Sequence, residues 1–191
     1  MNAMPDIIRS RYWHVLMATA LTLWLSGPAR ASEIVINEVQ TKLADKVYYL
    51  DAHIDYSLTE PMYEALHKGV PLTFVLDIEI ARVRHYWLND TVAELQQRYQ
   101  LEYQVLTQQY LVRNLNSGLQ FNLPSLDVAL SVLGTVVDLP VLDSQLLDAG
   151  ESYTGFLRAQ LDIEELPLPL RVMSYFSSEW RLRSEWKTWP F

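Results

Sequence analysis

Apolar and polar residues alternate along much of the chain, with the period of two that is typical of half-buried β-strands. Within residues 47–58, six apolar side chains fall on one face, and the polar positions of the other face are Asp51, His53, Asp55 and Ser57. The same alternation recurs in segments 72–80, 99–105, 156–164 and 180–186, and less regularly in 33–40. The pattern therefore predicts a mainly β protein.

Two stretches show helical spacing instead, and each ends at a glycine. Thr59 can cap a helix that ends at Gly69, and Ser125 can cap a second helix that ends at Gly134. A third, weaker helical turn is expected in residues 171–177. The sequence therefore predicts two or three short helices.

The connections between the strands indicate how the sheet is built. Turns near Gln108 and at Asn116-Ser117-Gly118 join neighbouring strands, and the prolines in 139–140 and 166–169 predict extended connectors. Because the strands do not alternate with full helices, a parallel sheet is not expected. We expect an antiparallel, immunoglobulin-like β-sandwich of about eight strands.

The beginning of the chain has the features of a targeting signal. A basic start precedes an apolar run over residues 15–25, and the small residue Ala31 suits cleavage by signal peptidase before Ser32. The run is shorter than the about 20 apolar residues that a membrane span requires. We expect residues 1–31 to be a cleavable signal peptide and 32–191 to form one domain in the periplasm. The alternative is an uncleaved N-terminal anchor.

Charge and composition exclude several classes of function. The whole chain carries a formal net charge of −8, and because residues 1–31 hold three arginines and one aspartate, the remainder carries −10. This acidity argues against binding nucleic acid or an anionic bilayer surface. The sequence contains no cysteine, which excludes disulfides and thiolate metal sites. It also lacks a phosphate-binding loop, a nucleophile elbow and a zinc-protease helix, so we expect no enzyme activity and no cofactor.

Asp51, His53 and Asp55 share one strand face and are the candidate metal ligands. Two carboxylates and an imidazole at this spacing can converge on a divalent ion, because alternate strand side chains project the same way. Asp77 and Glu79 could join them if their strand packs alongside. The alternative is an ordinary solvated face, which requires polar residues at the same positions.

Basic and aromatic residues cluster twice, and the partner-binding residues that we expect are Arg82, Arg84, Trp87, Arg183 and Trp189. Arginine with tryptophan is typical of interface hot spots, but also of sheet edges whose aromatic rings cover the core. We expect the structural role for Trp180 and Trp186, which alternate with charged residues. An acidic stretch over residues 138–165 is either a docking surface for a basic partner or a soluble rim.

Several short motifs are spread over residues 64–186: Glu64-Ala65-Leu66, Gly69-Val70-Pro71-Leu72, Arg82-x-Arg84 with Trp87, a tyrosine-rich hairpin from Tyr99, Leu166-Pro167-Leu168-Pro169-Leu170-Arg171 and Trp180-x-Leu182-x-Ser184-x-Trp186. Together they resemble a proteobacterial family of exported proteins catalogued as a domain of unknown function. The resemblance implies a Gram-negative periplasmic setting and, through neighbouring genes, a membrane sensor kinase as partner. It implies no catalytic residues.

These observations favour a non-enzymatic periplasmic binding or adaptor domain that engages an envelope protein, with a membrane sensor kinase as a candidate. The rival hypothesis is a metal-dependent hydrolase built on Asp51, His53 and Asp55. A lipid or small-molecule carrier is the third hypothesis, and it predicts an apolar cavity inside the sandwich.

Overall fold

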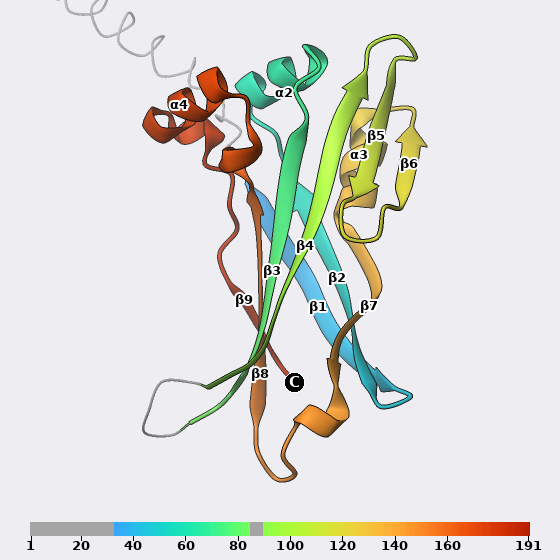
Figure 1. Cartoon of the computed structure of the whole chain (residues 1–191), viewed down its shortest axis with the longest axis vertical. Helices are drawn as coiled ribbons and strands as arrows, with labels where there is room; N and C mark the ends of the chain where they lie inside the picture. The colour runs from blue at the N-terminus through green and yellow to red at the C-terminus, as the bar shows by residue number, and fades with distance from the viewer. Residues whose placement is uncertain (1–32, 85–89) are drawn as a thin grey trace, which may run out of the picture. The chain divides into compact units, whose positions relative to one another are not determined.

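The structure is a computed structural model that describes residues 33–84 and 90–191, and within them the chain forms two antiparallel sheets (Figure 1). The three-stranded sheet has the order β1 (Ile34–Ala44), β2 (Val47–Tyr56) and β7 (Thr135–Asp143). The six-stranded sheet has the order β6 (Gln120–Leu123), β5 (Gln109–Asn114), β4 (Asp90–Gln104), β3 (Leu72–Arg82), β8 (Tyr153–Leu161) and β9 (Lys187–Pro190). The expected mainly β, antiparallel fold is confirmed.

The described residues also contain short helices. The α-helices are α2 (Glu60–His67), α3 (Leu126–Leu133) and α4 (Leu168–Phe176), and the 3₁₀ turns are η1 (Ser144–Leu146), η2 (Ile163–Glu165) and η3 (Ser178–Trp180). The side chains of Thr59 and Ser125 cap α2 and α3 as the sequence predicts, each accepting a hydrogen bond from a backbone N–H of the first turn. None of these helices combines the length and apolarity needed to cross a bilayer.

The core lies between the two sheets. From β3, the side chains that are fully buried there are those of Leu72, Phe74, Leu76, Ile78 and Ile80. The Tyr56 ring of β2 meets the Phe74 ring edge-on, with 5.0 Å between the ring centroids. Because burying each large apolar side chain contributes about 1.5–3 kcal/mol, this layer is the main source of stability in a chain without disulfides.

Three segments differ from the sequence-based prediction. Residues 135–143 form the edge strand β7, although the sequence predicts only a connector around Pro140; an edge strand tolerates proline because its outer N–H groups have no partner. Residues 166–169 are only partly a connector, since Pro167 caps α4 and Pro169 lies in its first turn, where a proline loses no hydrogen bond. Residues 180–186 do not form a regular strand. The backbone N–H of Ala159 donates to Ser184 Oγ at 3.0 Å, rather than to a backbone carbonyl of a neighbouring strand.

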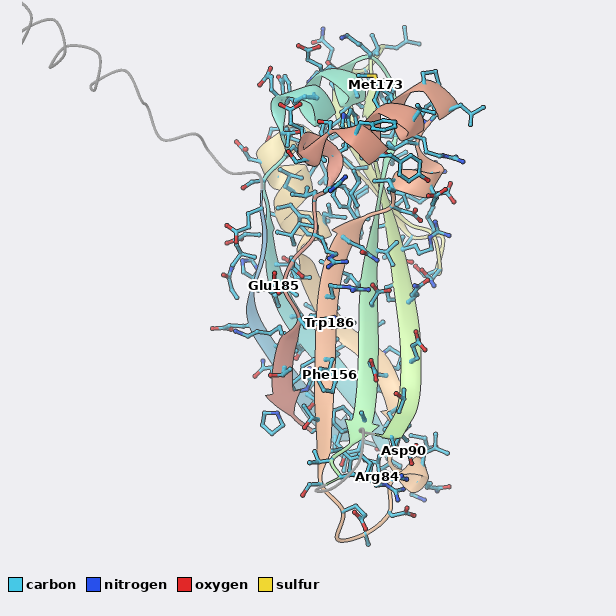
Figure 2. The ribbon with its side chains drawn as sticks, turned by 90° about the vertical axis from the view of Figure 1, so that its left-hand side faces the viewer. Arg84, Asp90, Phe156, Met173, Glu185 and Trp186 are labelled. Atoms are coloured by element: carbon cyan, nitrogen blue, oxygen red, sulfur yellow. The ribbon has the colours of Figure 1, made fainter. Side chains whose placement is uncertain are left out.

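The outer face of the six-stranded sheet is organised around Asp77, whose carboxylate is almost buried. It accepts two hydrogen bonds from Arg158 at 2.9 and 3.2 Å, and one each from Gln96 and Gln160. The Arg158 guanidinium lies 4.3 Å from the centroid of the Trp186 ring, which in turn packs edge-on against Phe156 (Figure 2). Trp186 therefore makes structural contacts, although 41% of it is exposed.

Candidate functional site

The three candidate metal ligands lie on the outer face of β2, as the sequence predicts, but each of them already contacts another side chain or a backbone N–H of the chain. Asp51 accepts hydrogen bonds from Lys42 Nζ at 3.0 Å and from the backbone N–H of Asp138 at 2.8 Å. Asp55 accepts a hydrogen bond from the side-chain amide of Asn37, and its carboxylate lies 3.5 Å from His53 Nε2. The Asp138 amide is the largest cause that holds the pKa of Asp51 below its usual value, with Lys42 adding to it.

Asp77 and Glu79 do not join these residues. They belong to β3, which lies in the six-stranded sheet, whereas β2 lies in the three-stranded sheet. In residues 33–84 and 90–191, no three acidic or histidine side chains stand close enough together to hold a metal ion. The geometry therefore adds no support to a metal-dependent hydrolase.

The first basic-aromatic cluster lies at the end of the domain opposite Met173, where Figure 2 places Arg84 and Asp90. Arg82 pairs with Asp148, and the Arg84 guanidinium pairs with the Asp90 carboxylate at 2.6 Å. Both cations are thus engaged within the chain, which lowers their value as hot spots. Trp87 lies outside the described residues, as do Ala31 and Ser32 of the expected cleavage site.

The second cluster does not form a surface patch around Trp189. The Trp189 side chain is buried in the core, with only 6% of its surface exposed, and its ring covers Gly155 of β8. This burial lends no support to the expectation that the ring meets a partner, because the period-two alternation does not say which face of a terminal strand is covered. Arg183 is exposed and pairs with Gln160 through a β-bridge, while Trp180 is buried, as expected.

The acidic stretch over residues 138–165 does not gather into one acidic surface. Five of its seven carboxylates pair with arginine or lysine side chains of the chain itself, and they are those of Asp138, Asp148, Asp162, Glu164 and Glu165. These pairs belong to different elements of both sheets and of η2. The stretch is therefore spread over several elements and mostly paired within the chain.

The most unusual surface of the described residues is α4, because four of its bulky apolar side chains point away from the core, while Leu170 packs against it. The exposed fractions are 70% for Leu168, 56% for Val172, 57% for Met173 and 87% for Phe176, and we call these four residues the α4 face. The buried position of the helix is Ser174, a small polar residue. The other two helices do the reverse and bury their large apolar residues, as Met62 and Leu66 of α2 and Leu133 of α3 illustrate.

Polar contacts hold α4 in this orientation. Arg171 donates to the Leu166 carbonyl, which precedes the helix, at 3.1 Å, while Ser174 Oγ is satisfied within the helix by the Arg171 carbonyl at 2.7 Å. The Tyr175 hydroxyl donates to Glu164 of η2, and this hydrogen bond is the largest cause that raises the pKa of Tyr175. Arg181 donates to the Tyr175 carbonyl from beyond η3. The helix is therefore fixed on both sides by partners, with its apolar residues outward.

The sequence contains a signal for this surface that the strand-based interpretation missed. Leu168, Val172 and Phe176 are spaced by four residues, which is the spacing of one helix face. Such a face normally packs inward, so the sequence alone would have placed it in the core. Contiguous exposed apolar residues on a soluble domain are typical of interaction sites.

Comparison with known proteins identifies one family. Residues 31–190 match the profile of DUF4390, a domain of unknown function. The same chain matches no curated protein and no solved structure. Because the family profile covers most of the sequence, the protein belongs to the DUF4390 family.

Proposed function

We propose that the protein is a non-enzymatic binding or adaptor domain of the periplasm, which engages an envelope protein through the α4 face. The observation that carries this proposal is the reversed polarity of α4, whose buried position is Ser174 and whose exposed positions are large and apolar. Covering a side chain such as Phe176, now 87% exposed, would contribute about 2 kcal/mol to binding.

The charges around α4 favour a protein over a lipid surface as the occupant. Three carboxylates, those of Glu164, Glu165 and Glu179, lie on the 3₁₀ turns on either side of the helix and are exposed. Glu164 and Glu165 already pair with Arg171 and Arg98, whereas Glu179 forms no ion pair within the described residues. Glu179 would be repelled by anionic headgroups and could pair with a basic side chain of a partner. Arginine is enriched in protein interfaces. A membrane sensor kinase is the specific candidate that the family resemblance suggests.

Site-specific photo-crosslinking in living cells tests the proposal. A benzophenone amino acid at position 176 should capture one envelope protein, identified by mass spectrometry, and a membrane sensor kinase would satisfy the specific prediction. The same probe at Leu146 of η1 is a matched control, because that side chain is 62% exposed and lies outside α4. The Leu146 probe should not capture that protein.

A substitution distinguishes specific binding at the α4 face from non-specific hydrophobic adsorption. Val172→Asp should abolish capture at position 176, because it places a carboxylate within the apolar surface, while Leu146→Asp should leave capture unchanged. Both positions are more than half exposed, so both variants should fold. The proposal fails if Val172→Asp captures as well as the unmodified chain, or if position 176 links only to phospholipid.

A further inference from the structure

A cleft of about 510 Å³ opens at the side of the sandwich where β7 faces β4, β5 and β6. Its floor includes Val112 and Val136, which are almost fully buried, and its rim includes Leu119, Phe121 and Val137, which are 57%, 46% and 64% exposed. α3 contributes the lining at one end. This volume lies within the range of about 300–1,000 Å³ that is usual for small-molecule sites.

The strands that flank the cleft are unsuited to pairing with another strand. β6 has four residues, and β7 contains Pro140, which cannot donate a ladder hydrogen bond. β7 also bulges, because Val137 and Asp138 together oppose the single residue Asp51 of β2, and Asp138 has a φ of +53°. An extended peptide could not add to such an edge, so an occupant must insert its own apolar body.

The bulge is held by Asp51, one of the residues that the sequence suggests as a metal ligand. Its carboxylate accepts the Asp138 N–H, which the bulge leaves without a strand partner, at 2.8 Å. Lys42 contacts the carboxylates of both residues, at 3.0 and 2.6 Å. This arrangement fixes the backbone that carries Val137 to the rim of the cleft.

The charges of the cleft select among apolar ligands. Its lining in the described residues includes no lysine, arginine or histidine, and the one charged lining side chain is Asp138. Lys42, the cation beside Asp138, is already engaged by two carboxylates. The polar lining groups include the Tyr99 phenol and the Asn114 amide, and burial raises the pKa of Tyr99, which keeps its hydroxyl protonated. Asn114 Oδ1 already accepts hydrogen bonds from the backbone N–H groups of Asn116 and Ser117, and the Asn114 side chain also contacts Tyr99, which leaves the Tyr99 hydroxyl as the group that can donate to a ligand. An anionic headgroup would find no countercharge here, whereas a neutral hydroxyl could accept this hydrogen bond.

From this geometry we propose that the cleft binds the acyl chain of an uncharged, single-chain amphiphile. The chain lies on Val112 and Val136 between the edges of the two sheets, and the rim residues Leu119, Phe121 and Val137 close over it. The hydroxyl-bearing head stays within reach of the Tyr99 hydroxyl. This site is separate from the α4 face and goes beyond the proposed adaptor function.

Fluorescence displacement with the exported, purified protein tests the site. The uncharged fluorophore N-phenyl-1-naphthylamine should bind saturably, monoolein should displace it, and oleate should displace it at least about tenfold less well. Val137→Asp and Phe121→Asp should each weaken monoolein binding by about tenfold or more, because each adds a charge to the apolar rim. Leu43→Asp, at a residue that is 55% exposed and outside the cleft, should bind normally.

Several results would overturn the assignment. Binding that is not saturable, or is equal in Val137→Asp and the unmodified protein, excludes the cleft as the site; because Val137 is 64% exposed, that variant should fold even if Phe121→Asp does not. Oleate that binds as tightly as monoolein excludes the uncharged head. Val172→Asp on the α4 face should bind monoolein normally, so loss of partner capture and loss of ligand binding are separable failures.

Discussion

Replacing Gly155 with alanine should displace the last strand of the six-stranded sheet. Gly155 of β8 lies opposite Trp189 of β9, and a Cβ on Gly155 would overlap the six-membered part of the Trp189 ring. Real side chains do not approach so closely, and the ring is 94% buried, so it has no free space into which it can turn. The alanine methyl group and the indole therefore cannot both keep their native positions.

The expected loss in the free energy of unfolding follows from what the buried Trp189 ring contributes to stability. Truncating a buried tryptophan to alanine costs about 3–5 kcal/mol, and Gly155→Ala displaces the same ring, partly offset by up to about 1 kcal/mol from a less flexible unfolded chain. We expect a loss of about 3 kcal/mol. For a domain of this size, that corresponds to a melting temperature lower by about 6–12 °C.

A double-mutant cycle measured by urea unfolding isolates the contact. Gly155→Ala should destabilise the unmodified protein, but it should be nearly neutral in a Trp189→Ala background, because no ring remains to be displaced. The coupling should therefore be about 2 kcal/mol or more. If the two free-energy losses simply add, or if Gly155→Ala is as stable as the unmodified protein, Trp189 does not pack on Gly155. The Trp189 ring would then again be a candidate for partner contact.

Two further perturbations test the polar contacts of the fold. Asp77→Ala should lower the free energy of unfolding, measured in urea, by about 2–3 kcal/mol, because it leaves the Arg158 guanidinium without its carboxylate partner. The cost is limited because 22% of the Arg158 side chain still reaches water. An unchanged free energy of unfolding would refute the role of this network. The Asp138 amide and Lys42 hold the pKa of Asp51 in the folded protein below its ordinary value of 3.8. The ionised Asp51 carboxylate therefore stabilises the fold fully above about pH 4, and this stabilisation is lost as the pH falls through the pKa of the folded state. Acid unfolding should accordingly be shallower in Asp51→Asn; an identical acid transition would contradict the contact.

The sequence predicts those parts of the fold that repeat a simple period. β2 and β3 were recognisable because apolar residues occupy every second position, and α2 and α3 because a capping residue and a glycine bound their helical spacing. β7 escaped recognition because Pro140 and the bulge at Asp138 interrupt its alternation. The period also gives no information on pairing, so the placement of β2 and β3 in different sheets was not predictable.

The candidate sites were less predictable, since each depends on which surface the fold leaves uncovered. Spacing by four residues shows that Leu168, Val172 and Phe176 share one helix face. It does not show that the opposite side, which carries Ser174, packs inward. The contact between Asp51 and Asp138 joins residues 87 positions apart, and its role in the bulge exists only once β7 pairs with β2. Spacing alone therefore offers Asp51 only as a candidate metal ligand or as part of a solvated face, and it does not reveal that the carboxylate accepts hydrogen bonds from Lys42 and from the Asp138 amide.

The unequal size of the two sheets explains why the domain leaves an apolar cleft open at one side. A three-stranded sheet is too narrow to cover the inner face of a six-stranded sheet, so other elements must shield the remainder from water. α3 does so by packing against both β5 and β2, yet the edge beside β6 stays open as the apolar cleft. The α4 face arises differently. Trp180 and Leu166, which flank the helix in the sequence, are buried, and of the apolar residues of α4 only Leu170 packs against the core. Because the two surfaces have different origins and share no residue, lengthening β6 should close the cleft without altering the α4 face, and ligand binding and partner capture should respond to different substitutions.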